Sequence, residues 1–124
     1  MPARARDAWA LAAVLAAAGT THLLLPGPYD AIVPRGLPGR PRSWTYASGV
    51  VELGIAAAVA HPATRRLGGY GAAALFVAVF PANVRMAADW RRATPARRAV
   101  AYARLPLQVP LVLWGLRVAR AASR

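Results

Sequence analysis

Four polar side chains stand alone inside four apolar stretches of this chain: His22, Glu52, Asn83 and Gln108. Glu52 is the only glutamate, and valine, leucine, glycine, isoleucine and alanine surround it between residues 49 and 60. A carboxyl group and an imidazole can exchange a proton, and two amides can orient a ligand by donating and accepting hydrogen bonds. These residue types therefore suggest polar-ligand binding or proton transfer within an apolar environment.

The four side chains converge if the apolar stretches form helices that run up and down across a bilayer. His22 and Asn83 lie late in the first and third stretches, and Gln108 lies early in the fourth, so all three share one leaflet. Glu52 lies nearer the midplane, but helical side chains lean toward the helix N-terminus, which brings Glu52 closer to the other three. Arg104, one turn before Gln108, is placed to close the top. We predict a ligand-binding or proton-carrying pocket built from these five residues.

A purely structural role is the alternative for the same side chains. Asn, Gln and His often hydrogen-bond across membrane helices as packing contacts, each worth about 0.6–2 kcal/mol. A buried carboxyl group is costly, however, and ionisable groups inside a membrane usually mark function. The functional pocket is therefore favoured, with Glu52 either neutral or paired with Arg104 across the pocket mouth.

Metal and haem sites find little support in the sequence. The chain has no cysteine, which excludes disulfides, thiol chemistry and cysteine-based metal sites. The second histidine, His61, falls at the opposite end of the predicted spans from His22, which argues against a haem held by two histidines. His22 and Glu52 alone would give a metal ion too few ligands. We expect no metal at this site.

The elements that must position these residues are long apolar helices. Crossing a bilayer core of about 30 Å takes roughly 20 apolar residues in a helix. The predicted helices cover about residues 8–25, 44–60, 67–86 and 104–120. Tryptophan and tyrosine lie near the ends of these stretches, as is typical of membrane interfaces. The sequence predicts one integral membrane domain over residues 1–124, an all-α four-transmembrane-helix up-and-down bundle. The first stretch could also be a signal peptide, but it lacks an obvious cleavage site.

Composition supports a membrane location. Hydrophobic residues make up 57 % of the 124 residues, against roughly 45–50 % in soluble domains. The net charge of +12 comes from sixteen arginines, most of them in the gaps between apolar stretches, where anionic lipid headgroups attract basic residues. A nucleic-acid-binding protein would instead align them on one face of a soluble element. We predict a multi-pass protein of the cell membrane whose partner is the lipid bilayer and not nucleic acid. Arginine counts on the two faces do not settle its orientation.

The connections between the predicted helices differ in character. Residues 26–43 contain five of the eleven prolines, which excludes a long helix and suggests an ordered cap over the bundle mouth. Residues 87–103 are basic and suggest a short amphipathic helix along the headgroups. Pro81, Pro106 and Pro110 are expected to kink the third and fourth helices and to free backbone carbonyls for the pocket.

Four segments resemble the DoxX-like family of small bacterial membrane proteins: "THLLLPGPYDAIVPRGLP", "SGVVELGIAAAVAHPATRR", "VFPANVRMA" and "RLPLQVPLVLW". The resemblance runs from about Thr21 to Trp114 and places His22, Glu52, Asn83 and Gln108 among the family's motif positions. It implies a four-helix bundle associated with a membrane redox complex, with redox partner proteins. It also implies a quinone or another small molecule as ligand, since the absence of cysteine argues against a dithiol relay.

Two functions of different classes follow from these observations. The first is a subunit that binds a quinone or small molecule in a membrane redox complex, with Glu52 as proton carrier and His22 as its partner. The second is a non-catalytic structural or assembly protein whose buried polar residues only lock the helices together. A transporter is disfavoured because the half of the bundle beyond Glu52 is apolar and rich in alanine. The sequence does not indicate whether the protein is an enzyme, and a homo-oligomer is a further candidate assembly.

Overall fold

A computed structural model describes residues 3–34 and 36–122, and these residues form helices joined by turns, with no strand among them. The helices are α1 (Ala3–Leu24), α2 (Pro26–Asp30), α3 (Pro41–Ala60), α4 (Arg65–Ala78), α5 (Phe80–Asp89) and α6 (Pro95–Ala122). The prediction of an all-α protein is confirmed. Helices α1, α3, α4 and α6 begin two to nine residues before the predicted bounds, whereas α1 and α3 end within one residue of them.

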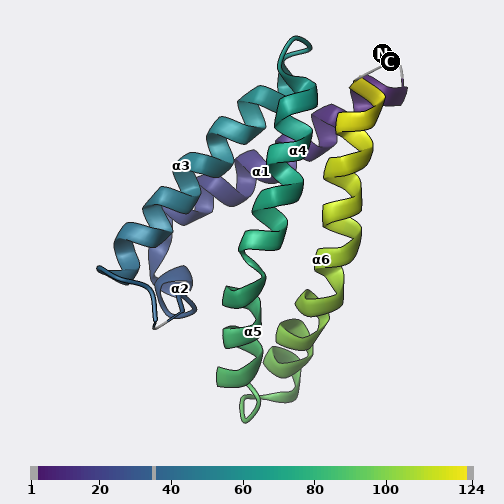
Figure 1. Ribbon diagram of the computed structural model, residues 1–124. Coiled ribbons are helices and arrows are strands. Elements are labelled where there is room, and N and C mark those ends of the chain that lie inside the picture. The colour runs from purple at the N-terminus through teal and green to yellow at the C-terminus, as the bar shows by residue number, and fades with distance from the viewer. Residues whose placement is uncertain (1–2, 35, 123–124) are drawn as a thin grey trace.

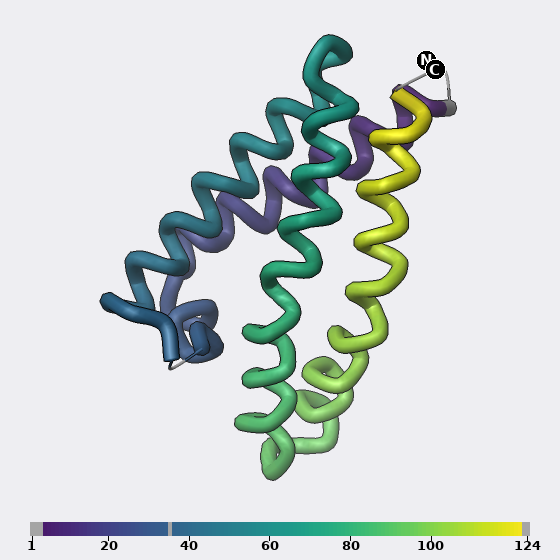
Figure 2. The backbone as a smooth tube through the Cα atoms, in the orientation of Figure 1, coloured from purple at the N-terminus to yellow at the C-terminus, as the bar shows by residue number. Residues whose placement is uncertain are grey.

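The long helices form two pairs, α1 with α3 and the α4–α5 segment with α6 (Figure 1). The start of α1 and the end of α6 lie at the same end of the molecule (Figure 2). Near this end the two pairs meet in an apolar core that includes Leu11, Leu15, Val59, Phe76 and Val118. Toward α2 and α5 the two pairs diverge (Figure 1).

Three segments are long and apolar enough to cross a membrane: Arg4–Leu24 in α1, Arg65–Asp89 across α4 and α5, and Pro95–Ala122 in α6. α3 has 20 residues but falls outside this set. Its first turns carry Arg42, Ser43 and other polar residues, and Glu52 interrupts its centre. The structure therefore supports a membrane protein with three candidate spans, and a fourth span through α3 is a proposal taken up below.

The third apolar stretch is broken where its proline predicts. α4 ends at Ala78 and α5 begins at Phe80, with Val79 between them and Pro81 in the first turn of α5. Proline has no backbone N–H and its ring collides with the carbonyl four residues earlier, so a straight helix cannot pass through this position. By contrast, Pro106 and Pro110 both lie inside the continuous helix α6.

The prediction of a separate amphipathic helix at residues 87–103 is wrong. The first part of this segment completes α5, residues 90–94 form a turn, and the rest is the beginning of α6. Thr94 Oγ1 accepts a hydrogen bond from the Arg97 N–H at 3.4 Å, and Pro95 occupies the first helical turn. Both features favour a helix start at this point, and the helix continues from there to Ala122.

Candidate functional site

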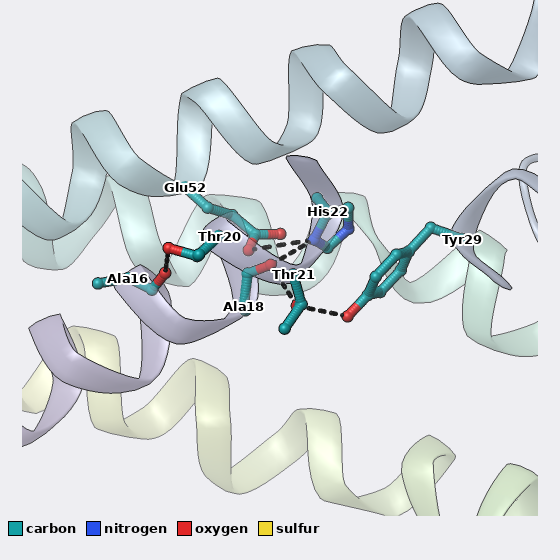
Figure 3. A network of polar contacts seen from close by, with 7 residues as sticks. All are labelled: Ala16, Ala18, Thr20, Thr21, His22, Tyr29 and Glu52. Atoms are coloured by element: carbon teal, nitrogen blue, oxygen red, sulfur yellow. Dashed lines mark hydrogen bonds and ion pairs between the residues drawn. The ribbon is translucent and has the colours of Figure 1, made fainter. Parts of the chain in front are cut away.

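The crossing of α1 and α3 brings His22 and Glu52 together. At this crossing Gly19 and Gly49 face each other so closely that a Cβ atom added at Gly19 would lie 2.8 Å from the Gly49 carbonyl oxygen. His22 follows Gly19 by three residues, and Glu52 follows Gly49 by three, so each side chain lies one turn from the contact. The His22 Nδ1 atom lies 3.6 Å from Glu52 Oε2 (Figure 3).

The hydrogen bonds of His22 define its tautomer. Its Nδ1 atom lies 2.7 Å from the carbonyl oxygen of Ala18. A carbonyl oxygen can only accept a hydrogen bond, so Nδ1 must carry the hydrogen. In the neutral imidazole this leaves Nε2 as an acceptor, and in the protonated imidazole Nε2 is a second donor. The ring is therefore held at Nδ1 by the Ala18 carbonyl.

Tyr29 from α2 covers the histidine. Its ring stacks on His22 with 3.7 Å between ring centroids and 18° between the ring planes. Its hydroxyl lies 2.7 Å from Thr21 Oγ1, which itself donates to the Ala18 carbonyl at 2.8 Å. Because the one hydrogen of Thr21 is used on Ala18, the Tyr29 hydroxyl must be the donor to Thr21. These contacts hold α2 over the end of α1, directly above the histidine (Figure 3).

Glu52 is deeply buried and poorly paired. Its residue surface is 5 % exposed, and Oε2 has no hydrogen-bond partner among the described residues. The only charged or chargeable group that the structure places beside it is His22. Buried carboxyl oxygens are normally hydrogen-bonded because desolvation without a partner costs several kcal/mol. The pair thus offers a free acceptor oxygen and a titratable ring in an apolar surrounding.

The segment over residues 26–43, here called the cap, is ordered in its described part and anchored to the start of α3. Asp30 accepts hydrogen bonds from Thr45 Oγ1 at 2.6 Å and from Arg42 Nε at 2.7 Å. Trp44 Nε1 donates to the Pro38 carbonyl at 2.6 Å. The bond from Thr45, followed by the bond from Arg42 and its positive charge, lowers the pKa of the Asp30 carboxyl. The cap therefore covers the His22 end of the α1–α3 pair through a short polar network.

The cap also bridges the two helix pairs. Ile32 is buried in a second apolar cluster with Met86 and Ala87 of α5 and Ala101 of α6. This contact joins the cap on α1 and α3 to the far ends of α5 and α6, where the pairs diverge (Figure 1).

The other three predicted site residues lie on α5 and α6. Gln108 Nε2 donates to the backbone carbonyl of Phe76, beside the break between α4 and α5. Arg104 Nη1 lies 3.7 Å from the sulfur of Met86. Asn83 is 2 % exposed, and its Nδ2 has no partner among the described residues. No ion pair or hydrogen bond found in the described part of the chain joins any of these three to His22 or Glu52. The sequence predicts a Glu52 that is either neutral or paired with Arg104, and the described residues show no contact between these two side chains.

Sequence reasoning missed Tyr29 and Thr21, and it identified Gly19 and Gly49 as residues that allow close helix approach without placing them beside the pair. Two signals could have found them. Tyr29 is the only aromatic residue in the cap, and it follows His22 by seven residues through a tight proline-rich turn. Each glycine precedes its polar side chain by the same three-residue step.

A metal site has no support in the described residues, where no group of three or more His, Cys, Asp or Glu side chains lies close enough to hold an ion. His22 instead donates to the Ala18 carbonyl, which also accepts from Thr21, and Tyr29 contacts the imidazole by ring stacking.

Comparison with known families decides the relationship of the chain. A family model described as a domain of unknown function (DUF8561) matches residues 11–119. The chain belongs to the DUF8561 family. No curated protein and no solved structure matches the chain. All four long helices of this DUF8561 protein fall within or overlap the matched residues, so the family match covers both helix pairs and the cap.

The identification with the DoxX-like family is therefore wrong. The stretches that suggested it combine a proline-rich connection with single polar residues inside apolar helices. Any small membrane protein with packed helices and a polar buried contact needs such features, because glycine and alanine allow close helix approach and isolated polar groups pair across helices. Short stretches of this kind do not separate one family from another.

Proposed function

We propose that this DUF8561 protein is a multi-pass membrane protein that binds a small polar molecule at the His22–Glu52 pair and exchanges a proton with it. The observation that carries the proposal is Glu52, a residue 5 % exposed whose Oε2 has no hydrogen-bond partner among the described residues and lies 3.6 Å from His22 Nδ1. A hydroxyl or N–H group of a ligand would give Oε2 the hydrogen bond that the protein does not supply.

The proposal includes α3 as a fourth span. Its 20 residues reach about 30 Å at 1.5 Å per residue, which equals the thickness of a bilayer core of about 30 Å. α3 also packs along α1, which is a candidate span. In this arrangement Glu52 lies near the middle of the membrane, where an ionisable side chain is retained chiefly for function.

A quinol headgroup is a fitting ligand for such a pair. Its hydroxyl group can donate to Glu52 Oε2 and release its proton to the pair, and its apolar tail keeps it dissolved in the bilayer. The fixed Nδ1–H of His22 leaves Nε2 free to take up or release a proton while the ring stays stacked on Tyr29. The redox complex and the quinone were both implied by the mistaken family identification. The complex forms no part of this proposal, and the quinol enters it only because its hydroxyl suits the acceptor oxygen of Glu52.

The test measures the binding of decylubiquinol to the full chain in lipid nanodiscs, with quenching of tryptophan fluorescence as the readout. We expect saturable binding to the unmodified chain and an affinity at least tenfold lower for Glu52→Gln, a loss of about 1.4 kcal/mol. Asp89→Asn is the matched control, because Asp89 is an exposed carboxyl whose one ion-pair partner among the described residues is Arg85. Equal affinity of Glu52→Gln and the unmodified chain would show that the His22–Glu52 pair is not part of the binding site.

A structural lock is the second candidate, favoured by the close contact of Gly19 and Gly49 beside the pair. If Glu52 only holds α1 against α3, Glu52→Gln keeps its hydrogen-bonding capacity and should be nearly silent in every assay. Glu52→Leu should then lower the thermal unfolding midpoint in detergent. The two candidates therefore differ in whether the glutamine variant binds ligand as the unmodified chain does.

A further inference from the structure

A second feature lies on the other helix pair, an open groove of about 510 Å³ where α4 gives way to α5 against α6. Its walls include Val77, Phe80, Leu105, Val109 and Leu113, and Gln108 is its polar member. Several walls face outward, with Val109 62 % and Leu113 58 % exposed. In a membrane this surface meets acyl chains, and its hollow shape distinguishes it from a flat helix face.

The local sequence explains why the groove forms at this place. Pro81 breaks the α4–α5 segment at Val79, and Gln108 reaches across from α6 to donate to the Phe76 carbonyl just before the break. The Gln108 amide thus connects α6 to the end of α4 by a hydrogen bond. The apolar side chains on either side of this hydrogen bond line the groove. The groove therefore results from the helix break at Val79.

The end of the groove nearest the turn between α5 and α6 is strongly basic. Between residues 85 and 104 the sequence carries six arginines and one acidic residue, Asp89. Asp89 is already paired with Arg85, at 3.4 Å. Arg104 contacts the sulfur of Met86, a weak acceptor, and Arg98 donates to the Arg91 carbonyl at 3.4 Å. Neither Arg98 nor Arg104 has a carboxylate partner among the described residues.

Arg98 lies on the groove side of α6 and Arg104 lies at its edge, with about 120° between the two around the helix. Arg98 precedes Leu105 by seven residues, and Arg104 precedes Gln108 by four, so helical periodicity puts each arginine above a groove residue. From Arg104 to Leu113 the helix rises about 13 Å at 1.5 Å per residue. One leaflet of a bilayer core is about 15 Å thick, half of about 30 Å. The groove therefore has the length of one acyl chain with cations at its headgroup end.

We propose that the groove between the α4–α5 break and α6 binds an anionic phospholipid. One acyl chain lies along Leu105, Val109 and Leu113, and the phosphate is held by Arg104 and Arg98. Guanidinium groups bind phosphate oxygens through charge-assisted, often bidentate hydrogen bonds. A zwitterionic headgroup carries its own cation, which partly offsets this attraction. This site is separate from the His22–Glu52 pair and does not depend on its function.

The first test compares headgroups on the unmodified full chain, purified in detergent and stripped of lipid. Phosphatidylglycerol is expected to raise the thermal unfolding midpoint and to remain bound in native mass spectrometry. Phosphatidylcholine with the same acyl chains should do so at least tenfold more weakly. Glycerol 3-phosphate, which has the charge without the chains, should have no effect. Equal effects of the two lipids, or an equal effect of glycerol 3-phosphate, would overturn the proposal, the latter in favour of a plain phosphate-binding patch.

The second test locates the site with two matched pairs of variants. Arg98→Gln with Arg104→Gln should weaken phosphatidylglycerol binding at least tenfold, whereas Arg66→Gln with Arg120→Gln, at the other end of the molecule, should not. Val109→Trp should fill the groove and displace the lipid, whereas Val50→Trp, at a position on α3 with the same 62 % exposure, should not. Retained binding in either groove variant would show that the lipid binds elsewhere.

Discussion

The two helix pairs use the same packing device and differ in what lies one turn away from it. α1 and α3 meet at Gly19 and Gly49, while α4 and α6 meet at Gly69 and Gly115. Beside the first contact stand an imidazole and a carboxyl group, and beside the second stand Ala73, Ala119 and other small residues. Close helix approach is therefore a general property of this fold, and the neighbouring residue decides whether the contact also carries chemistry.

The two helix pairs also differ in what covers them. The cap lies over the α1–α3 pair, with Tyr29 stacked on His22 and Asp30 bound to Thr45. The α4–α6 pair has no such cover along its break, where Val77 and Val109 face outward. One pair encloses a polar contact, and the other presents an apolar groove to lipid.

The largest expected effects come from placing a methyl group in either glycine contact. A Cβ at Gly69 would lie 2.6 Å from the backbone nitrogen of Ala119, and a Cβ at Gly49 would lie 2.9 Å from His22 Cβ. Overpacking of this kind typically costs about 1–3 kcal/mol, so Gly69→Ala and Gly49→Ala should both lower the midpoint of unfolding in detergent. Only Gly49→Ala should also weaken ligand binding at the His22–Glu52 pair.

Gly54→Ala is the control for both variants, because nothing lies within 4 Å of the added atom. It should leave the midpoint unchanged or raise it, since alanine favours a helix over glycine by about 1 kcal/mol. Equal loss of ligand binding in Gly69→Ala and Gly49→Ala would mean that the two contacts are not functionally distinct.

The next effect concerns the Gln108 hydrogen bond between the helices that flank the groove. Gln108→Leu keeps most of the side-chain volume but removes the donor to the Phe76 carbonyl. The loss of such a bond costs about 0.5–1.5 kcal/mol, and the unfolding midpoint should fall accordingly. His22–Glu52 ligand binding should not change, because no described contact links Gln108 to that pair. A loss of ligand binding in Gln108→Leu would revive the single pocket that the sequence predicted.

A smaller effect is expected from acid on the cap. The pKa of Asp30 is lowered by Thr45 and Arg42, so the stability it contributes is fully present above its unfolded pKa of about 3.9. This contribution is lost as the pH falls through the lowered folded pKa. Hydrogen exchange in residues 26–34 should therefore accelerate below about pH 4 in the unmodified chain.

Asp30→Asn should remove most of this pH dependence, and Asp89→Asn, outside the cap, should preserve it. An identical acid response in Asp30→Asn would place the titrating group elsewhere.

The smallest effect tests the cover of the histidine. Tyr29→Phe keeps the ring stacked on His22 but removes the hydroxyl that donates to Thr21. One neutral hydrogen bond contributes about 0.5–1.5 kcal/mol to stability. Because this bond is only partly buried, we expect a loss at the lower end of that range. Hydrogen exchange in α2 should rise slightly, while exchange in α4 should stay as it is. Tyr29→Ala, which removes the stacking as well, should give the larger rise.

Apolar runs and prolines predicted the helices, the break near Pro81 and the ordered cap, because these depend on local chemistry. They also placed His22 and Glu52 at similar heights, since the end of one helix and the start of the next share a membrane face and helical side chains lean toward the helix N-terminus. Helical periodicity gives the height and face of a side chain but not the angle between helix pairs. The divergence of the two pairs therefore left Gln108 and Arg104 with partners of their own. The candidate redox partners and a homo-oligomer stay predictions.

The central claim is that Glu52 meets a ligand and does not merely lock two helices together. Because Glu52 is the only glutamate, the chain labelled with ¹³C-glutamate has one side-chain carboxyl signal in solid-state NMR of lipid-reconstituted protein. We predict that this signal shifts when decylubiquinol is added to saturation, and that His22→Phe reduces the shift. A Glu52 carboxyl signal that stays unchanged at saturating decylubiquinol would contradict the account and leave the pair as a structural lock.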